Sequence, residues 1–358
     1  MQFISKNRLF DKVKLLVPPV LLGYAVFCNM WHFLYEVKSL ENILDISINI
    51  NFCIAGVQTG ITIFVVNIGL KNNQLKVQRY FKKIAETSEE FLNKAREQHP
   101  NENLKAANTV VRTFVSVFMV SITIFPVIAL YQTDFVSPLF YRFPGIPSRS
   151  LFFYPVNIIG QLFIYNYLIY SVIIMDCLFF IYLLYFRGVL HSITAVADLL
   201  SRKENLKNCD RILQSIYEAH RELLDEFRSL SEVMWHFYCH KMSVMILFLC
   251  SCFFLYSKTN SIASGLILQS MLLSLLIILC VSGQLLDNSS ENLHETLYQS
   301  LWYEMQLKDQ RNFLLIYKGT QRNIKVERMG IDKISFSTLV QVIKTAISYA
   351  AFMYTVLL

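Results

Sequence analysis

The chain has few charged residues for its length. They make up 16% of its 358 positions, whereas soluble domains carry about 25%. Hydrophobic residues reach 54%, and the mean hydropathy is +0.41. A large all-α core of this composition lacks the polar surface that would cover it in water. The composition therefore excludes an ordinary soluble domain and favours a membrane protein.

Motifs for enzyme chemistry are also missing. The sequence has no glycine-rich phosphate loop, no paired acid motif and no serine nucleophile elbow. His236 and His240 lie one helical turn apart, but Phe237 stands where a zinc protease needs glutamate. We therefore expect no enzymatic activity, no cofactor and no metal site.

Long apolar runs are what the sequence does contain. Each of seven runs reaches or exceeds the roughly 20 residues that span a hydrocarbon core. The runs cover 15–35, 40–70, 109–132, 154–186, 237–256, 262–286 and 336–357. We predict an all-α membrane protein with seven transmembrane helices.

The basic residues predict the orientation of these helices. Of the 33 Lys and Arg residues, 27 lie before the first run or in the connections that follow the second, fourth and sixth runs, and only 4 lie in the other connections. The positive-inside rule places the larger set in the cytoplasm. The N-terminus is then cytoplasmic and the C-terminus extracellular, the reverse of a G-protein-coupled receptor. The net charge of +7 follows from this asymmetry, so no nucleic-acid partner is expected.

The pattern of apolar and charged residues divides the chain into three parts. Residues 1–287 would form helices one to six, with a ligand-binding outer half and cytoplasmic helix extensions. Residues 288–333 would form a cytoplasmic anchor helix, amphipathic over 292–317, and a hinge; residues 334–358 would form helix seven. Helically spaced apolar residues within 187–235 predict that helices four and five continue into the cytoplasm. This helical layer serves either subunit assembly or packing within one chain.

Aromatic and hydroxyl side chains gather in the outer half of the predicted bundle. They suit a small volatile molecule, because apolar burial supplies affinity and one polar group orients the ligand. Each of them could instead face lipid or pack in the core. The long, proline- and aromatic-rich loop over 133–153 is either a lid over this site or a packed cap. The candidate ligand residues are Ser47, Ile48, Asn51, Ser121, Phe125, Ile128, Tyr131, Phe163, Tyr167, Tyr170, Leu266 and Ser270.

Two acidic or basic residues deep in the apolar runs have their own expectations. Asp176, in the inner part of the fourth run, either pairs with a nearby Lys or Arg, which we favour, or lines a cavity. Lys344, in the inner half of the seventh run, either reaches the cytoplasmic interface or lines a wide aqueous vestibule.

The last sixty residues carry a more specific pattern. It runs through Leu301–Tyr303 and Arg311–Gln321 to Lys344–Leu358, which contains Ser348 and Tyr349. This pattern resembles the C-terminal part of insect odorant receptors. The resemblance implies a tetrameric, odorant-gated, non-selective cation channel whose helix seven lines a central pore.

The resemblance also implies the partners. The chain lacks the large insertion that the shared odorant receptor co-receptor carries in its second inner loop, so it resembles an odorant-tuned subunit. Co-receptor subunits, a small volatile organic ligand and membrane lipid are then its partners, at the plasma membrane of a sensory neuron dendrite. A homotetrameric gustatory receptor channel stays open as an alternative, as does a metabotropic receptor or transporter.

Finally, the resemblance assigns roles in the last helices. The pore and gate region maps to Ser348, Tyr349, Phe352 and Val356, and the last two lie four residues apart on one helix face. The subunit anchor maps to Trp302, Arg311, Leu314 and Leu315.

Overall fold

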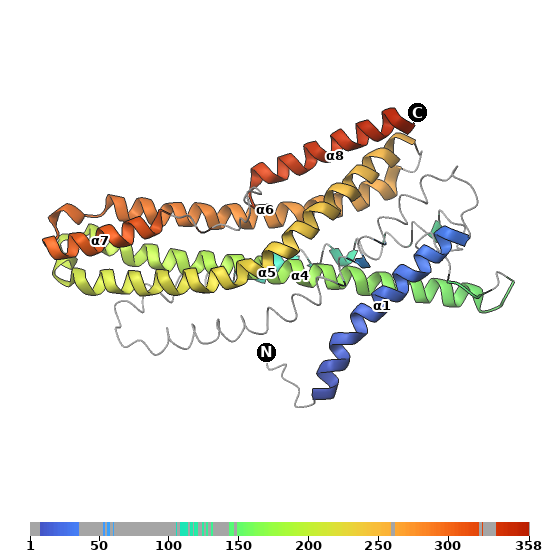
Figure 1. The fold of residues 1–358 in the computed structure, drawn as a ribbon, viewed down its shortest axis with the longest axis horizontal. Helices are drawn as coiled ribbons and strands as arrows, with labels where there is room; N and C mark the ends of the chain where they lie inside the picture. The colour runs from blue at the N-terminus through green and yellow to red at the C-terminus, as the bar shows by residue number, and fades with distance from the viewer. Residues whose placement is uncertain are drawn as a thin grey trace.

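The computed structural model describes residues 8–35, 143–146, 149–258, 262–321, 324 and 334–357, with further positions scattered within 53–60 and 105–131. Every regular element in these parts of the chain is a helix. The elements, in chain order, are α1 (Arg8–Tyr35), α4 (Phe153–Asp198), η1 (Leu199–Ser201), η2 (Lys203–Asn208), α5 (Cys209–Lys258), α6 (Ile262–Gln299), η3 (Trp302–Glu304), α7 (Leu307–Thr320) and α8 (Phe336–Leu357) (Figure 1).

Three of these helices are much longer than a bilayer is thick. α4, α5 and α6 contain 46, 50 and 38 residues. At a rise of 1.5 Å per residue, even α6 is about 57 Å long, against a hydrocarbon core of about 30 Å. The prediction that helices four and five continue beyond their apolar runs is confirmed, and α6 does the same. Most of the predicted run over 40–70 and part of 109–132 lie outside the described residues.

Two stretches of the described residues are long and apolar enough to cross a membrane. They are Asp176–Ser201 and Leu273–Glu304, with mean hydropathies of 1.5 and 1.4. More than half of each stretch is buried within the chain itself. A core helix of a soluble protein can have the same length and composition, so these two stretches alone are weak evidence for membrane spanning.

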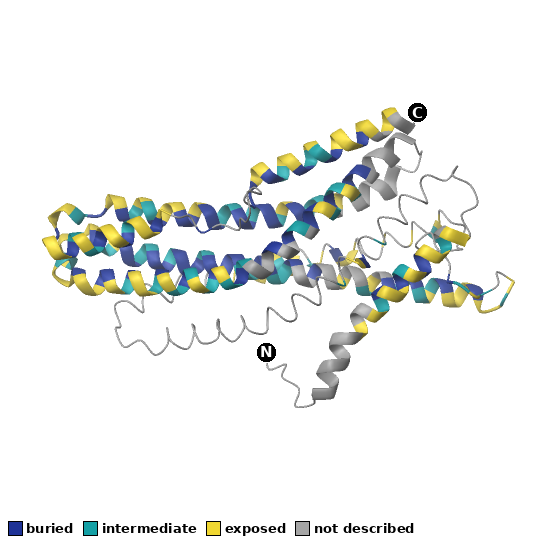
Figure 2. Cartoon of the chain, viewed as in Figure 1, coloured by how far each residue is buried: buried dark blue, intermediate teal, exposed yellow. Residues whose placement is uncertain are grey.

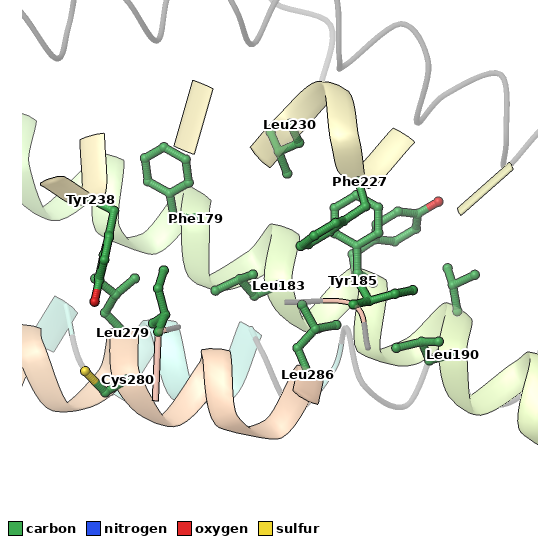
Figure 3. Packing of buried hydrophobic residues seen from close by; sticks show 14 of the residues in the cluster. Phe179, Leu183, Tyr185, Leu190, Phe227, Leu230, Tyr238, Leu279, Cys280 and Leu286 are labelled. Atoms are coloured by element: carbon green, nitrogen blue, oxygen red, sulfur yellow. The ribbon is translucent and has the colours of Figure 1, made fainter. Parts of the chain in front are cut away.

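A seven-residue repeat of buried side chains holds α4, α5 and α6 together. In each helix the buried positions alternate at spacings of four and three over 22 residues, the pattern of knobs-into-holes packing. Phe186 of α4 meets Phe227 of α5 edge to face, with ring centroids 5.3 Å apart. Figure 3 shows Leu183 of α4, Phe227 of α5 and Leu286 of α6 in the same cluster. Figure 2 shows the buried residues along the inner sides of these helices. The repeat consists of Phe179, Leu183, Phe186, Leu190, Ile193 and Ala197 in α4, continued by Leu200 in η1; Cys209, Leu213, Ile216, His220, Leu223, Phe227 and Leu230 in α5; and Leu279, Gly283, Leu286, Ser290, Leu293 and Leu297 in α6, continued by Ser300 directly after it.

The predicted anchor helix is divided into two helices in the structure. α6 ends at Gln299, and α7 begins at Leu307. The hydroxyl of Ser300 donates a hydrogen bond to the carbonyl oxygen of Leu297 at 2.7 Å, and the N–H of Leu301 bonds to the carbonyl oxygen of Leu200 at 3.3 Å. These bonds replace the continuing helical pattern and attach the turn to η1, directly after α4. Amphipathic spacing on both sides of the turn concealed it in the sequence.

A stack of aromatic rings fixes α7 to α6. The ring of Trp302 lies parallel to that of Phe313 at 6.0 Å, and Phe313 lies parallel to Tyr317 at 6.0 Å. Tyr317 in turn stacks on His294 of α6 at 4.3 Å. Offset-stacked rings add to the free energy gained by burial alone. The stack therefore ties η3, α7 and α6 into one unit at the end of the molecule farthest from α8 (Figure 1).

Two described points between α7 and α8 contact α6. The N–H of Ile324 donates to the hydroxyl of Ser290 at 3.0 Å. Seven residues earlier on α6, Gly283 lets the backbone of Ile334 approach so closely that a Cβ on Gly283 would lie 2.4 Å from the Ile334 carbonyl oxygen. From there α8 runs back over α5, its main partner (Figure 1).

Replacing Gly283 tests this contact. Gly283→Ala should lower the free energy of unfolding by about 1–3 kcal/mol, because backbone or helix must shift to admit the methyl group. Gly319→Ala is the matched control, since a Cβ there meets nothing within 4 Å, and in a helix it should be neutral or slightly stabilising. Thermal unfolding of the detergent-solubilised protein measures both; equal melting temperatures for the two variants would contradict the close contact.

The burial of His220 predicts that the stability of the helical layer depends on pH. Burial lowers the pKa of this histidine below its ordinary value of 6.5. As pH falls below 6.5, the unfolded chain binds the proton more readily than the folded one, so stability is lost on acidification. We expect His220→Leu to lose less stability than wild type between pH 7.5 and pH 5.5 in thermal unfolding. Equal losses in the two proteins would show that His220 does not contribute.

Candidate ligand site and pore helix

Three aromatic residues form one stripe on α4. Phe163, Tyr167 and Tyr170 follow each other at spacings of four and three, so they share a helix face. Phe163 and Tyr170 are exposed in the single chain, and Tyr167 is half-buried. This stripe is the best-described part of the predicted ligand site.

The other predicted ligand residues divide into two groups. Tyr131 and Ser270 are exposed in the single chain. Leu266 belongs to α6, but its side chain is outside the described residues. Outside them too are Ser47, Ile48, Asn51, Ser121, Phe125 and Ile128.

An apolar cavity of about 220 Å³ extends the stripe toward the inner half of the predicted membrane region. Among the residues that line this cavity, Tyr170 is the only one predicted to bind ligand. Tyr170 and Cys177 are the two lining side chains that carry a polar hydrogen. A volume below the roughly 300 Å³ of drug-sized sites suits a small organic molecule. The other lining residues were not among the predicted ligand residues. They recur every three to four positions on two facing helices, and this spacing is visible in the sequence. The lining is Val111, Val115, Met119, Tyr170, Ile173, Cys177, Leu178 and Ile181.

Asp176 is paired, as predicted. Its carboxylate accepts a hydrogen bond from the ammonium group of Lys241 on α5, and both side chains are buried. Asp176 also lines a second, small cavity of about 10 Å³ between α4, α6 and the segment around Val111. The charge count had placed Lys241 in an inner connection, whereas the structure buries it in the bundle.

The segment around Phe143, in the long loop over 133–153, packs against the bundle. Phe143 is buried: its ring stacks on Tyr24 of α1 at 6.1 Å and lies against Gly160 of α4. Its N–H donates to the side-chain oxygen of Asn157 at 2.8 Å, and Asn157 donates to the carbonyl oxygen of Phe153 at 2.9 Å. Around Phe143 the loop is therefore a packed cap.

α8 buries one face and exposes two others. The buried face packs chiefly on α5 and carries small or medium-sized side chains. One exposed face is apolar, with Phe336, Val340, Ile347 and Tyr354. The second, on the other side, follows Ser337, Gln341, Thr345, Ser348 and Phe352, of which only Thr345 is half-buried. Val356 continues this second face, but its side chain is outside the described residues.

The family of the chain follows from a match over most of its length. A family model described as "7tm Odorant receptor" matches residues 71–347. The chain belongs to this family. It is a receptor of the membrane, in a family of receptors and not of enzymes.

Solved structures agree with this odorant receptor fold. The fold is similar to that of the insect olfactory receptor OR5 from Machilis hrabei, with a TM-score of 0.79 at 12% identity over 99% of this chain and 93% of that one. The same receptor in complex with eugenol gives a TM-score of 0.75 at 13% identity, over 99% and 92% of the two chains. No curated protein matches the chain in sequence.

The predicted anchor residues of this odorant receptor take two different positions. Trp302 is half-buried in the ring stack within its own chain. Arg311, Leu314 and Leu315 lie on the exposed face of α7, where the two leucines are 53% and 71% exposed. Leu314 and Leu315 are thus available for a contact with another subunit.

Removing the ring of Phe143 should loosen the outer loop of this odorant receptor. Phe143→Ala deletes the buried ring, a change that costs about 3–5 kcal/mol in a core, so residues 133–152 should be cleaved faster by an added protease. Phe152→Ala is the control, because that ring in the same loop is 71% exposed. Limited proteolysis of membrane-embedded receptor measures both rates. Equal rates in the two variants would contradict the packed cap.

Proposed function

We propose that this odorant receptor is an odorant-tuned subunit of a ligand-gated, non-selective cation channel. It assembles with the odorant receptor co-receptor as a heterotetramer in the plasma membrane, with its N-terminus in the cytoplasm. Residues 1–287 bind the ligand, 288–333 anchor the subunit, and 334–358 line the pore. The exposed polar face of α8 is the observation that carries this proposal.

A helix that contacts only lipid and protein gains nothing from an exposed polar face. Ser337, Gln341 and Ser348 are exposed in the single chain, although most residues of α8 are apolar. Polar groups in a membrane bundle face a water-filled cavity or a neighbouring helix. A symmetric tetramer puts this face around an axis, where its hydroxyl and amide groups can solvate a passing cation. The apolar face with Val340 and Ile347 is left for the neighbouring subunit or lipid.

The gate lies near the outer end of this polar face. Phe352 is 64% exposed and aligned with Ser348 and, by helical spacing, with Val356. A ring of apolar side chains closes a pore by excluding water, and it opens when the helices move apart.

The ligand is a small volatile organic molecule. The aromatic stripe of α4 and the adjoining apolar cavity supply apolar surface, and the hydroxyl of Tyr170 supplies a polar group at their junction. The complex of OR5 with eugenol supports a site for such a ligand in this fold. Because the two chains are only 13% identical, the side chains proposed to contact the ligand are taken from the structure of this chain and not from OR5.

Subunits meet through α7. Leu307 and Leu314 lie seven residues apart on one exposed face of that helix, and the exposed Leu315 borders this face. Exposed leucines clustered on one face indicate an interface with another protein. The opposite face, with Phe313, is occupied by the ring stack within the chain.

Co-expression tests the proposal directly. Cells that carry this chain and a co-receptor should give cation currents in response to volatiles from a broad panel, whereas cells with this chain alone should stay silent. Confirmed surface expression without any evoked current would overturn the proposal. Responses of the chain alone to sugars or bitter compounds would favour a gustatory receptor.

The gate can be tested by truncating one side chain of α8. Phe352→Ala should raise the leak current without ligand, because a smaller ring of side chains no longer excludes water. Tyr354→Ala, on the apolar face of the same helix, is the matched control. Both currents are normalised to surface-labelled receptor. A leak raised by the Tyr354 variant and not by the Phe352 variant would place the other face of α8 on the pore.

A further inference from the structure

We propose that the Asp176–Lys241 ion pair passes the effect of ligand binding from α4 to α5, and through α5 to the pore helix α8. This inference rests on the proposed function and deepens it, because it names the residues that couple the ligand site to the gate. It assigns to both side chains a positioning role; neither contacts ligand or ion.

The pair lies directly beneath the candidate ligand site. Asp176 follows Tyr170 by six residues on the same continuous helix, which is about 9 Å along its axis. Its neighbour Cys177 lines the same apolar cavity as Tyr170. A ligand that tilts or rotates α4 at the aromatic stripe therefore moves the carboxylate of Asp176 with it.

The two charges hold α4 and α5 together firmly. The side chains of Asp176 and Lys241 are 7% and 5% exposed. Separating them would leave two buried charges without compensation, which is far less favourable than keeping the pair. When α4 moves, Lys241 follows, and α5 with it.

The carboxylate is also incompletely satisfied in this arrangement. Its oxygen Oδ2 is buried without a hydrogen-bond partner, while Oδ1 receives the bond from Lys241. Asp176 borders the small cavity of about 10 Å³, close to the space that one water molecule needs. A movement of α4 relative to α5 that widens this cavity would admit a water molecule to Oδ2. The environment of the ion pair therefore depends on the relative position of the two helices.

α5 carries the movement to the pore. α8 packs on α5 more extensively than on any other described element. The contact face of α8 includes Ala346 and Ala350, whose small side chains permit close approach of the two helices. The route from ligand to gate is then Tyr170, Asp176, Lys241, α5 and α8, with every step a described contact or a continuous helix.

A purely structural ion pair would have different consequences. It would affect how many receptors fold and reach the surface, but receptors at the surface would respond to ligand as wild type does. A coupling pair changes the ligand concentration for half-maximal current, or the ligand-free current, in receptors that have folded.

The experiment compares four receptors co-expressed with a co-receptor and an activating volatile found for wild type. They are wild type, Asp176→Asn, the double variant Asp176→Asn/Lys241→Met, and a control double variant, Lys203→Met/Glu304→Gln. The control removes another ion pair, Lys203–Glu304 at 2.9 Å, whose side chains are 73% and 33% exposed in the helical layer. Currents are normalised to surface-labelled receptor. The neutral double variant leaves no buried charge unpaired, so it is expected to fold even where the single variant does not.

We expect the neutral double variant to shift the half-maximal concentration by about five-fold or more, or to raise the ligand-free current by a similar factor, in line with ordinary coupling between sites. The control double variant should match wild type. Wild-type dose–response curves from the neutral double variant at the surface would overturn the inference and leave the proposed function standing. A wild-type complex without any ligand-evoked current would overturn the proposed function and this inference with it.

Discussion

The seven-residue repeat of buried side chains in α4, α5 and α6 is the contact on which the rest of the structure depends. It fixes the register of three long helices over 22 residues each. Most members of the repeat are apolar and supply the burial that stabilises the layer. The exceptions on α6 are informative: Gly283, Ser290 and Ser300 are the positions where Ile334, Ile324 and the turn before α7 attach. α6 thus packs in the bundle and also holds Ile324 and Ile334, which lie between α7 and α8 in the sequence.

The sequence predicted the helical elements well where local spacing determines them. The continuation of helices four and five was visible because apolar residues recur at helical spacing among the charges of 187–235. The break between α6 and α7 was not visible, because it depends on a bond between Leu301 and Leu200. Residues so far apart in sequence meet only after the bundle has formed. The residues at the break, Leu301 and Trp302, are apolar like those on the buried face of an amphipathic helix, so the sequence shows no sign that the helix ends there.

The candidate site shows the same division. A charged residue in an apolar run predicts a partner of opposite sign, so the kind of partner for Asp176 followed from the sequence. Its identity did not, since Lys241 lies 65 positions away and the relative depth of two helices is a property of their packing. Val111, Val115 and Met119 form a visible stripe, but only the packed structure shows that this stripe faces Tyr170 across a cavity. The reason for a glycine at position 160 is likewise visible only in the structure, where the ring of Phe143 leaves no room for a Cβ.

The ring stack at the base of the molecule gives this receptor an intrinsic optical reporter. The chain has three tryptophans. Trp235 is buried on α5, Trp31 stacks on Tyr35 at the far end of α1, and Trp302 alone lies face to face with a ring of α7. Indole emission responds to the polarity and the neighbours of the ring. In a protein that keeps only Trp302, the emission would follow the docking of α7 in real time, without any attached dye.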